Sequence, residues 1–306
     1  MKNILIAVGG NALLKKGESP DFETHMKNAK ATASLISKFI KKEGHKVILT
    51  HGNGPQVGDE LIRNKHASRY MPSLPLHILT AETQAYIGSI LAYSMDPLLK
   101  DIGMTSEVIV THAVVRKDDP AIANPSKQIG PYYSKAELEK ELKFRKFSYV
   151  KEKGSYRMVV PSPKPVSVLE MDAIRESAKQ NRLVICGGGG GIPVLKSGKW
   201  YKGFDGVIDK DATSALIAVN VNVDELIILT EAEALYGNFP DRSSIIREIS
   251  VRDAKALLGR LENGTIRPKL EACIRFASST GRIARIGALE KLEEISAGRS
   301  GTAIRP

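Results

Sequence analysis

Residues 183–211, LVICGGGGGIPVLKSGKWYKGFDGVIDKD, join a buried strand, a glycine loop and a charged segment. The stretch opens with the apolar run Leu183–Cys186, the pattern of a short buried strand, and passes at once into five glycines, Gly187–Gly191. Glycine tolerates positive φ and lets backbone N–H groups approach a ligand closely. A strand that ends in such a loop is a candidate cradle for phosphate oxygens, and Lys210, held between two carboxylates, adds positive charge. The alternative is that the glycines form only a flexible surface turn.

The composition is that of an ordinary globular protein. The chain has 306 residues, of which 42% are hydrophobic and 26% charged, enough to bury a large core in one α/β domain or in two lobes. The two cysteines, Cys186 and Cys273, lie in apolar surroundings without metal-ligand spacing, so we expect reduced core residues in a cytoplasmic protein. No apolar run approaches membrane-spanning length, so we expect no membrane association.

The charge balance indicates anionic partners. Lys and Arg number 45 and Asp and Glu 34, which gives a formal net charge of +11 at pH 7. Such an excess suits nucleic acid, a membrane surface or small anionic substrates. The sequence carries no aromatic-rich RNA motif, zinc pattern or helix-turn-helix signal. We therefore expect small-molecule substrates and no nucleic acid.

The N-terminal part alternates strands, glycine-bearing loops and helices. The apolar run Ile4–Val8 ends at Gly9-Gly10-Asn11-Ala12, and Val47–Thr50 runs into His51-Gly52-Asn53-Gly54-Pro55. Between them, Ser19-Pro20-Asp21 starts an apolar pattern of helical spacing. This alternation predicts a parallel sheet with right-handed crossovers, whose ligands bind beyond the carboxyl ends of the strands.

Further elements continue the pattern after residue 79. We expect helices at 79–99, 212–219, 253–258 and 270–278, and strands at 107–110, 225–230 and 282–286. Residues 117–165 are different, because they are rich in proline and charge and hold only one short expected helix, at 135–144. We interpret this excursion as a small protruding subdomain or lid. A disordered insert is the alternative, and Tyr149, Tyr156 and the apolar Met158–Val160 argue against it.

Seven blocks of this sequence, in the same chain order, resemble the carbamate kinases of the amino-acid-kinase superfamily. The resemblance covers almost the whole chain and includes the lid segment. The blocks are residues 9–13, 50–58, 127–133, 157–165, 187–194, 207–211 and 298–302.

The resemblance implies an α/β fold, an open αβα sandwich around a mainly parallel sheet with a small protruding lid subdomain. An N-terminal half, 1–178 with the lid at about 117–165, would hold the carbamoyl group, and a C-terminal half, 179–306, the nucleotide. The implied reaction is ATP + carbamate ⇌ ADP + carbamoyl phosphate. The resemblance further implies that the reaction runs in the ATP-forming direction, in arginine and carbamoyl-phosphate catabolism. It also implies a need for Mg²⁺ and a homodimer.

Three lysines match the family's catalytic positions. The resemblance implies that Lys210 binds the transferring phosphoryl group, that Lys127 reaches it from the lid, and that Lys269, expected just before a helix, neutralises the nucleotide's terminal phosphates. Asp211 would orient these lysines and keep them charged. Carbamate is already an anion, so no general base is required. For His51 we therefore favour a hydrogen-bonded structural role over direct contact with substrate.

Backbone N–H groups would complete the site. We expect those of Gly9, Gly10, Gly52, Asn53 and Gly54, with the side chain of Asn11, to bind the carbamoyl group and the transferring phosphate; tight turning alone is the alternative. The expected nucleotide contacts are Gly188, Gly189, Gly190, Asp209, Thr230, Tyr236, Asn238 and Lys269. Mg²⁺ should be bound mainly through nucleotide phosphates and water, so no protein metal ligand is named.

The sequence departs from the family pattern at two positions on the nucleotide side. Arg267 stands where glycine is common, and would either add a phosphate contact or crowd the nucleotide and displace Lys269. Glu231 stands where aspartate is usual. Two rival functions stay open: another acid kinase of the superfamily, for acetylglutamate or aspartate, and a non-catalytic regulator that senses nucleotide or binds nucleic acid.

Overall fold

A central sheet of eight strands organises the molecule. The computed structural model describes residues 1–10, 13–15, 17–141, 148–152, 154–238, 241–261 and 264–306. Along the sheet the strands are β15 (Glu248–Ser250), β17 (Thr302–Arg305), β16 (Ala284–Ala288), β12 (Glu225–Thr230), β1 (Asn3–Val8), β2 (Lys46–His51), β9 (Arg182–Cys186) and β3 (Thr105–Val108). From β16 to β3 in this order, every two neighbouring strands are parallel. At the other side, β17 runs antiparallel to β16. The sheet is therefore mainly parallel, as expected.

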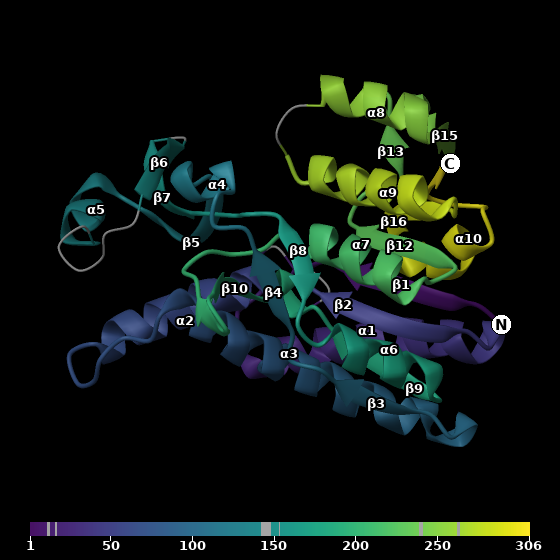
Figure 1. The fold of residues 1–306 in the computed structure, drawn as a ribbon, viewed down its shortest axis with the longest axis horizontal. Helices are drawn as coiled ribbons and strands as arrows, with labels where there is room; N and C mark the ends of the chain where they lie inside the picture. The colour runs from purple at the N-terminus through teal and green to yellow at the C-terminus, as the bar shows by residue number, and fades with distance from the viewer. Residues whose placement is uncertain (11–12, 16, 142–147, 153, 239–240, 262–263) are drawn as a thin grey trace.

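Helices cover both faces of this sheet (Figure 1). On one face, a buried apolar cluster joins the strands to α1 (Phe22–Glu43), α3 (Leu76–Leu99) and α10 (Leu292–Ser296). On the other, a second cluster joins them to α6 (Met171–Lys179), α7 (Lys210–Val221), α8 (Val251–Arg260) and α9 (Ile266–Thr280). The predicted αβα sandwich is confirmed.

The ends of α1 illustrate how local sequence sets the elements. Asp21 caps the helix by accepting a hydrogen bond from the N–H of Thr24 at 2.8 Å, and Gly44 ends it in the left-handed region at φ 63°. Between these caps the apolar spacing buries Ala29, Ala33 and Ile36 against the sheet. The helix predicted after Ser19-Pro20-Asp21 is confirmed, with Asp21 as its cap.

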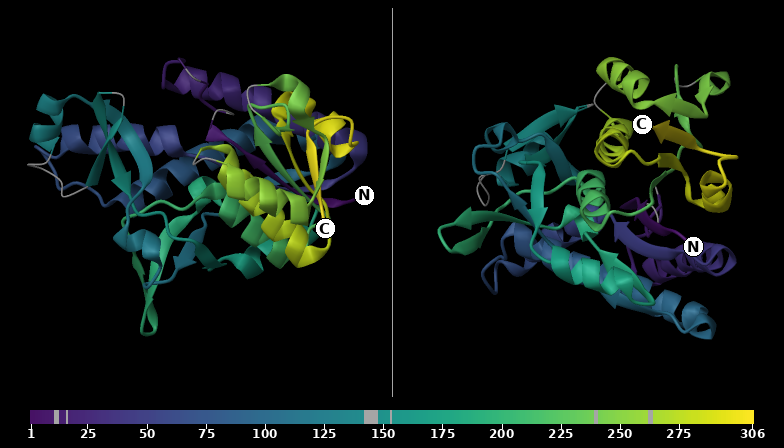
Figure 2. Two further views of the ribbon diagram at one scale, coloured as in Figure 1. Left: turned by 90° about the horizontal axis from the view of Figure 1, so that it is seen from above. Right: turned by 45° about the vertical axis from the view of Figure 1, so that its right-hand side comes forward.

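Residues 117–165 form a protruding subdomain, which stands out from the body in both Figure 1 and Figure 2. Its three-stranded sheet has the order β5 (Lys127–Tyr133), β7 (Ser155–Val160), β6 (Ser148–Glu152), with α4 (Pro120–Ala123) and α5 (Lys135–Glu141) beside it. Ile129 and Met158 pack on Val57 and Leu61 of α2 (Gly54–Ala67). The expectation of a folded subdomain rather than a disordered insert is confirmed for the described residues; 142–147, the end of the expected helix, lie outside them.

A second sheet is absent from the expectations above. Its order is β11 (Trp200–Gly203), β10 (Ile192–Ser197), β4 (His112–Val115), β8 (Pro165–Val168). Because β10 pairs with β4, and β9 lies between β2 and β3, strands of residues 182–203 are hydrogen-bonded to N-terminal strands. The expected boundary between the halves 1–178 and 179–306 therefore separates strands that are hydrogen-bonded in the same sheets.

Several expected boundaries are corrected. The strand expected at 107–110 is β3, which ends at Val108, and the helix expected at 270–278 begins at Ile266, so Lys269 lies inside its first turn. Short elements complete the fold: β13 (Leu235–Tyr236), β14 (Ile245–Ile246) and the 3₁₀ turns η2 (Lys100–Ile102), η3 (Gly188–Gly190), η4 (Arg242–Ser244) and η5 (Leu289–Lys291). In the described part of the chain, no helix has both the length and the apolar character needed to cross a membrane.

Candidate active site

The glycine loops meet at the carboxyl ends of neighbouring strands. β1, β2 and β9 are adjacent in the sheet, and the residues that directly follow them are Gly9, Gly52 and Gly187 respectively. The loops touch: a Cβ on Gly52 would lie 2.9 Å from the backbone N of Gly10, and a Cβ on Gly189 would collide with the side-chain amide of Asn53. Parallel strands place their carboxyl ends at one edge, where α/β proteins bind ligands.

The five-glycine loop is fixed rather than flexible. Gly187 to Gly191 are all buried, and Gly187, Gly189, Gly190 and Gly191 have φ of 61°, 61°, 87° and 90°. Thr111 Oγ1 accepts a hydrogen bond from the N–H of Gly187 at 2.9 Å, and Thr213 Oγ1 donates one to the carbonyl of Gly190 at 2.7 Å. Only glycine adopts this backbone readily. Because the loop is buried and hydrogen-bonded at both ends, it is not the flexible surface turn of the alternative interpretation.

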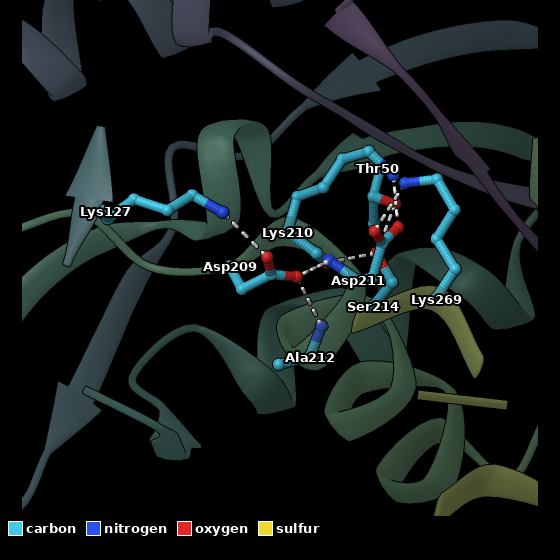
Figure 3. A network of polar contacts seen from close by, with 8 residues as sticks. All are labelled: Thr50, Lys127, Asp209, Lys210, Asp211, Ala212, Ser214 and Lys269. Carbon is cyan, nitrogen blue, oxygen red and sulfur yellow. Dashed lines mark hydrogen bonds and ion pairs between the residues drawn. The ribbon is translucent and has the colours of Figure 1, made fainter. Parts of the chain in front are cut away.

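Two lysines share the carboxylate of Asp211 (Figure 3). Lys210, the first residue of α7, forms an ion pair with Oδ1, and Lys269, from the first turn of α9, places its Nζ 2.9 Å from Oδ2. The side chains of Lys210, Lys269 and Asp211 are only 11%, 13% and 4% exposed. The structure thus brings together residues 58 positions apart around one buried anion.

The electrostatics of this cluster keep Asp211 ionised. Burial disfavours its charged form, but Lys210 and Lys269 outweigh burial and lower the pKa of Asp211 to about 2. Burial lowers the pKa of Lys210, and the Asp211 carboxylate acts against that shift. Asp211 therefore fixes the direction of the two ammonium groups at every pH at which the protein would work.

Asp209 links α7 to the third lysine. As the N-cap of α7, its Oδ1 accepts hydrogen bonds from the N–H groups of Asp211 and Ala212 at 2.9 and 3.4 Å. Its Oδ2 lies 2.9 Å from Nζ of Lys127, the first residue of β5 in the lid. From the sequence, only a nucleotide contact is expected for Asp209. An aspartate directly before a predicted helix is an N-cap signal, but nothing local points to Lys127.

Hydrogen bonds from β2 hold the first turn of α7 in place. Thr50 and Ser214 join their hydroxyls at 2.6 Å, and Ser214 Oγ also donates to the carbonyl of Lys210 at 2.6 Å. Both side chains are fully buried. Neither Thr50 nor Ser214 is among the site residues expected from the sequence, yet they fix the backbone that carries Lys210.

His51 lies inside the protein as a neutral side chain. It is 1% exposed, burial lowers its pKa to about 4, and Nδ1 lies 3.1 Å from the carbonyl of Gly52. A Cβ on Gly188 would lie 2.6 Å from its ring. This geometry supports the hydrogen-bonded structural role favoured above.

The loops expected to bind the carbamoyl group are close together, but not all of the expected hydrogen-bond donors are available to a ligand. The N–H of Gly52 donates to the carbonyl of Val8 at 3.1 Å, so Gly52 contributes close approach rather than a donor in this arrangement. The side-chain amide of Asn53 donates to Thr83 Oγ1 at 3.0 Å and does not cap α2. Asn53 therefore leaves the first-turn N–H groups of Gly54 and Gln56 without a side-chain cap, and Pro55 between them has no N–H. Gly9 and Gly10 lie opposite, and Asn11 is outside the described residues.

The expected nucleotide contacts follow β12, on the other side of β1. Thr230 ends β12, Tyr236 lies in β13, and the N–H of Asn238 donates to Ser244 Oγ at 3.0 Å. Glu231 is exposed directly after the strand. These positions flank the glycine loops, which is compatible with a nucleotide lying along the same edge.

Arg267 faces away from the lysine cluster. Its guanidinium donates to the carbonyls of Leu258 and Leu261 at 3.0 and 2.9 Å and lies 3.2 Å from Glu271. It therefore caps the end of α8, while Lys269 stays on Asp211. In this structure the arginine does not displace Lys269, and its hydrogen bonds and ion pair are with the end of α8 and Glu271.

Comparisons with known proteins agree with this geometry. The model of the "Amino acid kinase family" matches residues 2–287. Carbamate kinases of Trichomonas vaginalis and Thermoplasma volcanium are 38% and 39% identical to this chain, over 99% and 100% of both sequences respectively. The carbamate kinase of Giardia lamblia bound to AMP-PNP superposes with a TM-score of 0.90 and 36% identity, over 99% of this chain and 98% of that one. The chain therefore belongs to the amino acid kinase family and, within it, to the carbamate kinases.

Proposed function

We propose that the protein catalyses ATP + carbamate ⇌ ADP + carbamoyl phosphate through converging lysines and without a general base. The observation that carries the proposal is the shared anchoring of Lys210 and Lys269 on buried Asp211, beside the glycine loops. Related chains named carbamate kinase, aligned over their full length, give the acceptor.

Phosphoryl transfer asks the protein for alignment and charge neutralisation. Lys210 would contact the oxygens of the moving phosphoryl group, Lys269 the terminal phosphates of the nucleotide, and Lys127 the same phosphoryl group from the lid. Carbamate attacks as an anion and carries no proton that must be removed. His51, neutral and buried, is not required for proton transfer.

The two substrates would occupy the two sides of the lysine cluster. Gly9, Gly10, the α2 amides from Gly54 and the side chain of Asn11 would bind the carbamoyl group. Gly188 to Gly190 would approach the nucleotide phosphates, with Thr230, Tyr236 and Asn238 toward the nucleoside. Carbamate and carbamoyl phosphate both decompose in water, and the lid that carries Lys127 would exclude it.

Mg²⁺ would be bound mainly through nucleotide phosphates and water. Among the residues that the structure describes, no group of three or more His, Cys, Asp or Glu side chains is arranged to hold a metal ion. Asp209 and Asp211, the two carboxylates in the lysine cluster, both pair with lysines. A nucleotide-borne cation, which supplies charge neutralisation, fits this donor set better than a protein cage.

We further propose the ATP-forming direction, in arginine or carbamoyl-phosphate catabolism, in the cytoplasm and as a homodimer. The family resemblance supports these proposals, and two fully buried free cysteines suit a reducing compartment. Sedimentation equilibrium would test the dimer.

An acceptor panel tests the function itself. Purified protein with Mg²⁺ and ATP is given carbamate, acetylglutamate or aspartate, and ADP release is followed. We expect turnover with carbamate alone. Turnover only with an amino-acid acceptor would replace this proposal with another acid kinase, and none with any acceptor would favour a non-catalytic regulator.

A further inference from the structure

The Asp209 carboxylate serves two different elements at once. One oxygen is bonded to the backbone of α7, which carries Lys210 and Asp211, and the other lies 2.9 Å from Nζ of Lys127 (Figure 3). Lys127 comes from the lid, 82 residues earlier in the chain. A single side chain thus joins the lid lysine to the helix that carries the other half of the cluster.

The lid does not depend on this ion pair for its position. Lys127 begins β5, which pairs with β7, and the base of the lid packs on α2 through Ile129 and Met158. The N–H of Val207 also donates to the carbonyl of Pro161 at 3.0 Å. The ion pair therefore determines where one long side chain points rather than whether the subdomain docks.

Charge and exposure place this contact where a substrate can replace it. Three lysines and two aspartates give the cluster a net charge of +1. Lys210 and Lys269 share Asp211, whereas Lys127 faces Asp209, and these two side chains are 42% and 24% exposed. A phosphoryl group could therefore reach Lys127, because that contact is more open to solvent than the Asp211 cluster.

We propose that Asp209 is a positioning residue that holds Lys127 beside the N-terminus of α7 until a phosphoryl group takes its place. The carboxylate stands in for the incoming anion, so the flexible lysine is already ordered when the substrate arrives. This inference rests on the proposed function, because it assumes that Lys127 contacts the phosphoryl group.

Asp209→Asn separates the two tasks of the side chain. Asparagine is as good an N-cap as aspartate, so α7 keeps its start, while the ion pair to Lys127 is lost. Because a mispositioned group lowers the rate of the chemical step, we expect kcat to fall about tenfold. The KM for carbamoyl phosphate should not rise, because the cluster charge changes from +1 to +2. General loss of structure would not produce this split.

A double-mutant cycle tests whether Asp209 acts through Lys127. ATP formation from ADP and carbamoyl phosphate is measured for the wild type, Asp209→Asn, Lys127→Ala and the double variant. We expect Asp209→Asn to cost about tenfold alone but less than about twofold once Lys127 is alanine. Equal costs in both backgrounds would overturn the proposal. Asp118→Asn, which breaks an exposed ion pair with Arg116, is the matched control and should leave kcat unchanged.

A measurement without substrate separates this proposal from the proposed function. If the wild type forms no ATP from carbamoyl phosphate, the proposed function fails, and NMR of the free protein still tests the link. The side-chain ¹⁵N signal of Lys127 should move toward that of an unpaired ammonium in Asp209→Asn, while the β5 amides keep their exchange rates because β7 and α2 hold the lid. An unchanged Lys127 side-chain signal, with ordinary unfolding stability, would contradict the link.

Discussion

The ammonium group of Lys269 lies 2.9 Å from Oδ2 of Asp211, whose other oxygen pairs with Lys210. One buried carboxylate thereby sets the positions of two cations that come from different helices. Preorganised charge of this kind stabilises charge that is redistributed during a reaction, at no cost of reorganisation.

Lys210→Ala should lower kcat for ATP formation by about a hundredfold or more, the scale of losing one preorganised electrostatic contact. Lys210→Arg, which keeps the charge but not the shape, should recover part of the rate. Steady-state kinetics with ADP and carbamoyl phosphate check both. If the alanine variant turns over as fast as the wild type, Lys210 has no catalytic role.

Asp211→Asn should reduce both stability and turnover. The substitution leaves the nearly buried ammonium groups of Lys210 and Lys269 without their anion, which typically costs about 3 kcal/mol or more in unfolding free energy. Urea unfolding measures the loss, and kcat should fall with it. A variant as stable as the wild type would show that Asp211 does not hold the lysines together.

Gly189→Ala and Gly198→Ala form a matched pair. Both glycines have φ near +60°, but a Cβ on Gly189 would collide with Asn53, whereas one on Gly198, in the β10–β11 turn, has nothing within 4 Å. Gly198→Ala should cost about 1 kcal/mol of stability from backbone strain alone. Gly189→Ala should cost at least about 1 kcal/mol more, the scale of overpacking, and raise the KM for ADP. Equal costs would mean that the loop tolerates a side chain.

Arg267→Ala should affect stability rather than catalysis. Removing the two hydrogen bonds to the end of α8 should cost about 1 kcal/mol, with kcat changed less than about twofold. Glu271→Gln, which loses only the exposed ion pair with Arg267, should cost less than about 0.5 kcal/mol. If kcat drops sharply in Arg267→Ala, the arginine contacts the nucleotide after all.

The pH dependence should show an alkaline limb from Lys210. Because burial lowers the pKa of this lysine below its usual 10.5, its charge and therefore kcat/KM are lost as pH rises, earlier than for an exposed lysine. Lys210→Arg should lack this limb, since arginine stays charged. Stability responds with the opposite sign: between the folded and unfolded pKa values the unfolded chain binds more protons, so this group favours folding as pH rises.

The pH profile of kcat/KM should show no step near pH 6.5 from His51, because the pKa of this histidine lies near 4. For Asp211, the pKa is about 2 in the folded state against its usual 3.8, so its stabilising contribution is present above about pH 4. That contribution is lost as pH falls through 2. A step near pH 6.5 that vanishes in His51→Asn would reinstate His51 as a titrating catalytic group.

Sequence patterns identified the elements in which local signals agree. β1, β2, β9 and β12 are continuous apolar runs, and α1 carries both a cap and a stop. The four-stranded sheet was missed because its strands are short, and β8 and β10 both contain proline. Their pairing depends on contacts between distant segments that no local pattern encodes.

The site shows the same limit. The three lysines and Asp211 were identified by motif, and the structure places all four in one polar network through Asp209. The direction in which Arg267 points, and the ion pair between Lys127 and Asp209, depend on how α8, α9 and the lid pack. Lys127 and Asp209 are 82 residues apart, and Arg267 bonds to the end of the preceding helix, so neither contact follows from the pattern of a single element.

ATP formation from ADP and carbamoyl phosphate by the purified protein is the most direct test of the central claim. We predict Mg²⁺-dependent ATP synthesis by the wild type, and a rate lowered by about a hundredfold in Lys210→Ala with the fold intact. A folded wild-type protein that makes no ATP, or one whose rate survives replacement of Lys127, Lys210 and Lys269 in turn, would contradict the account.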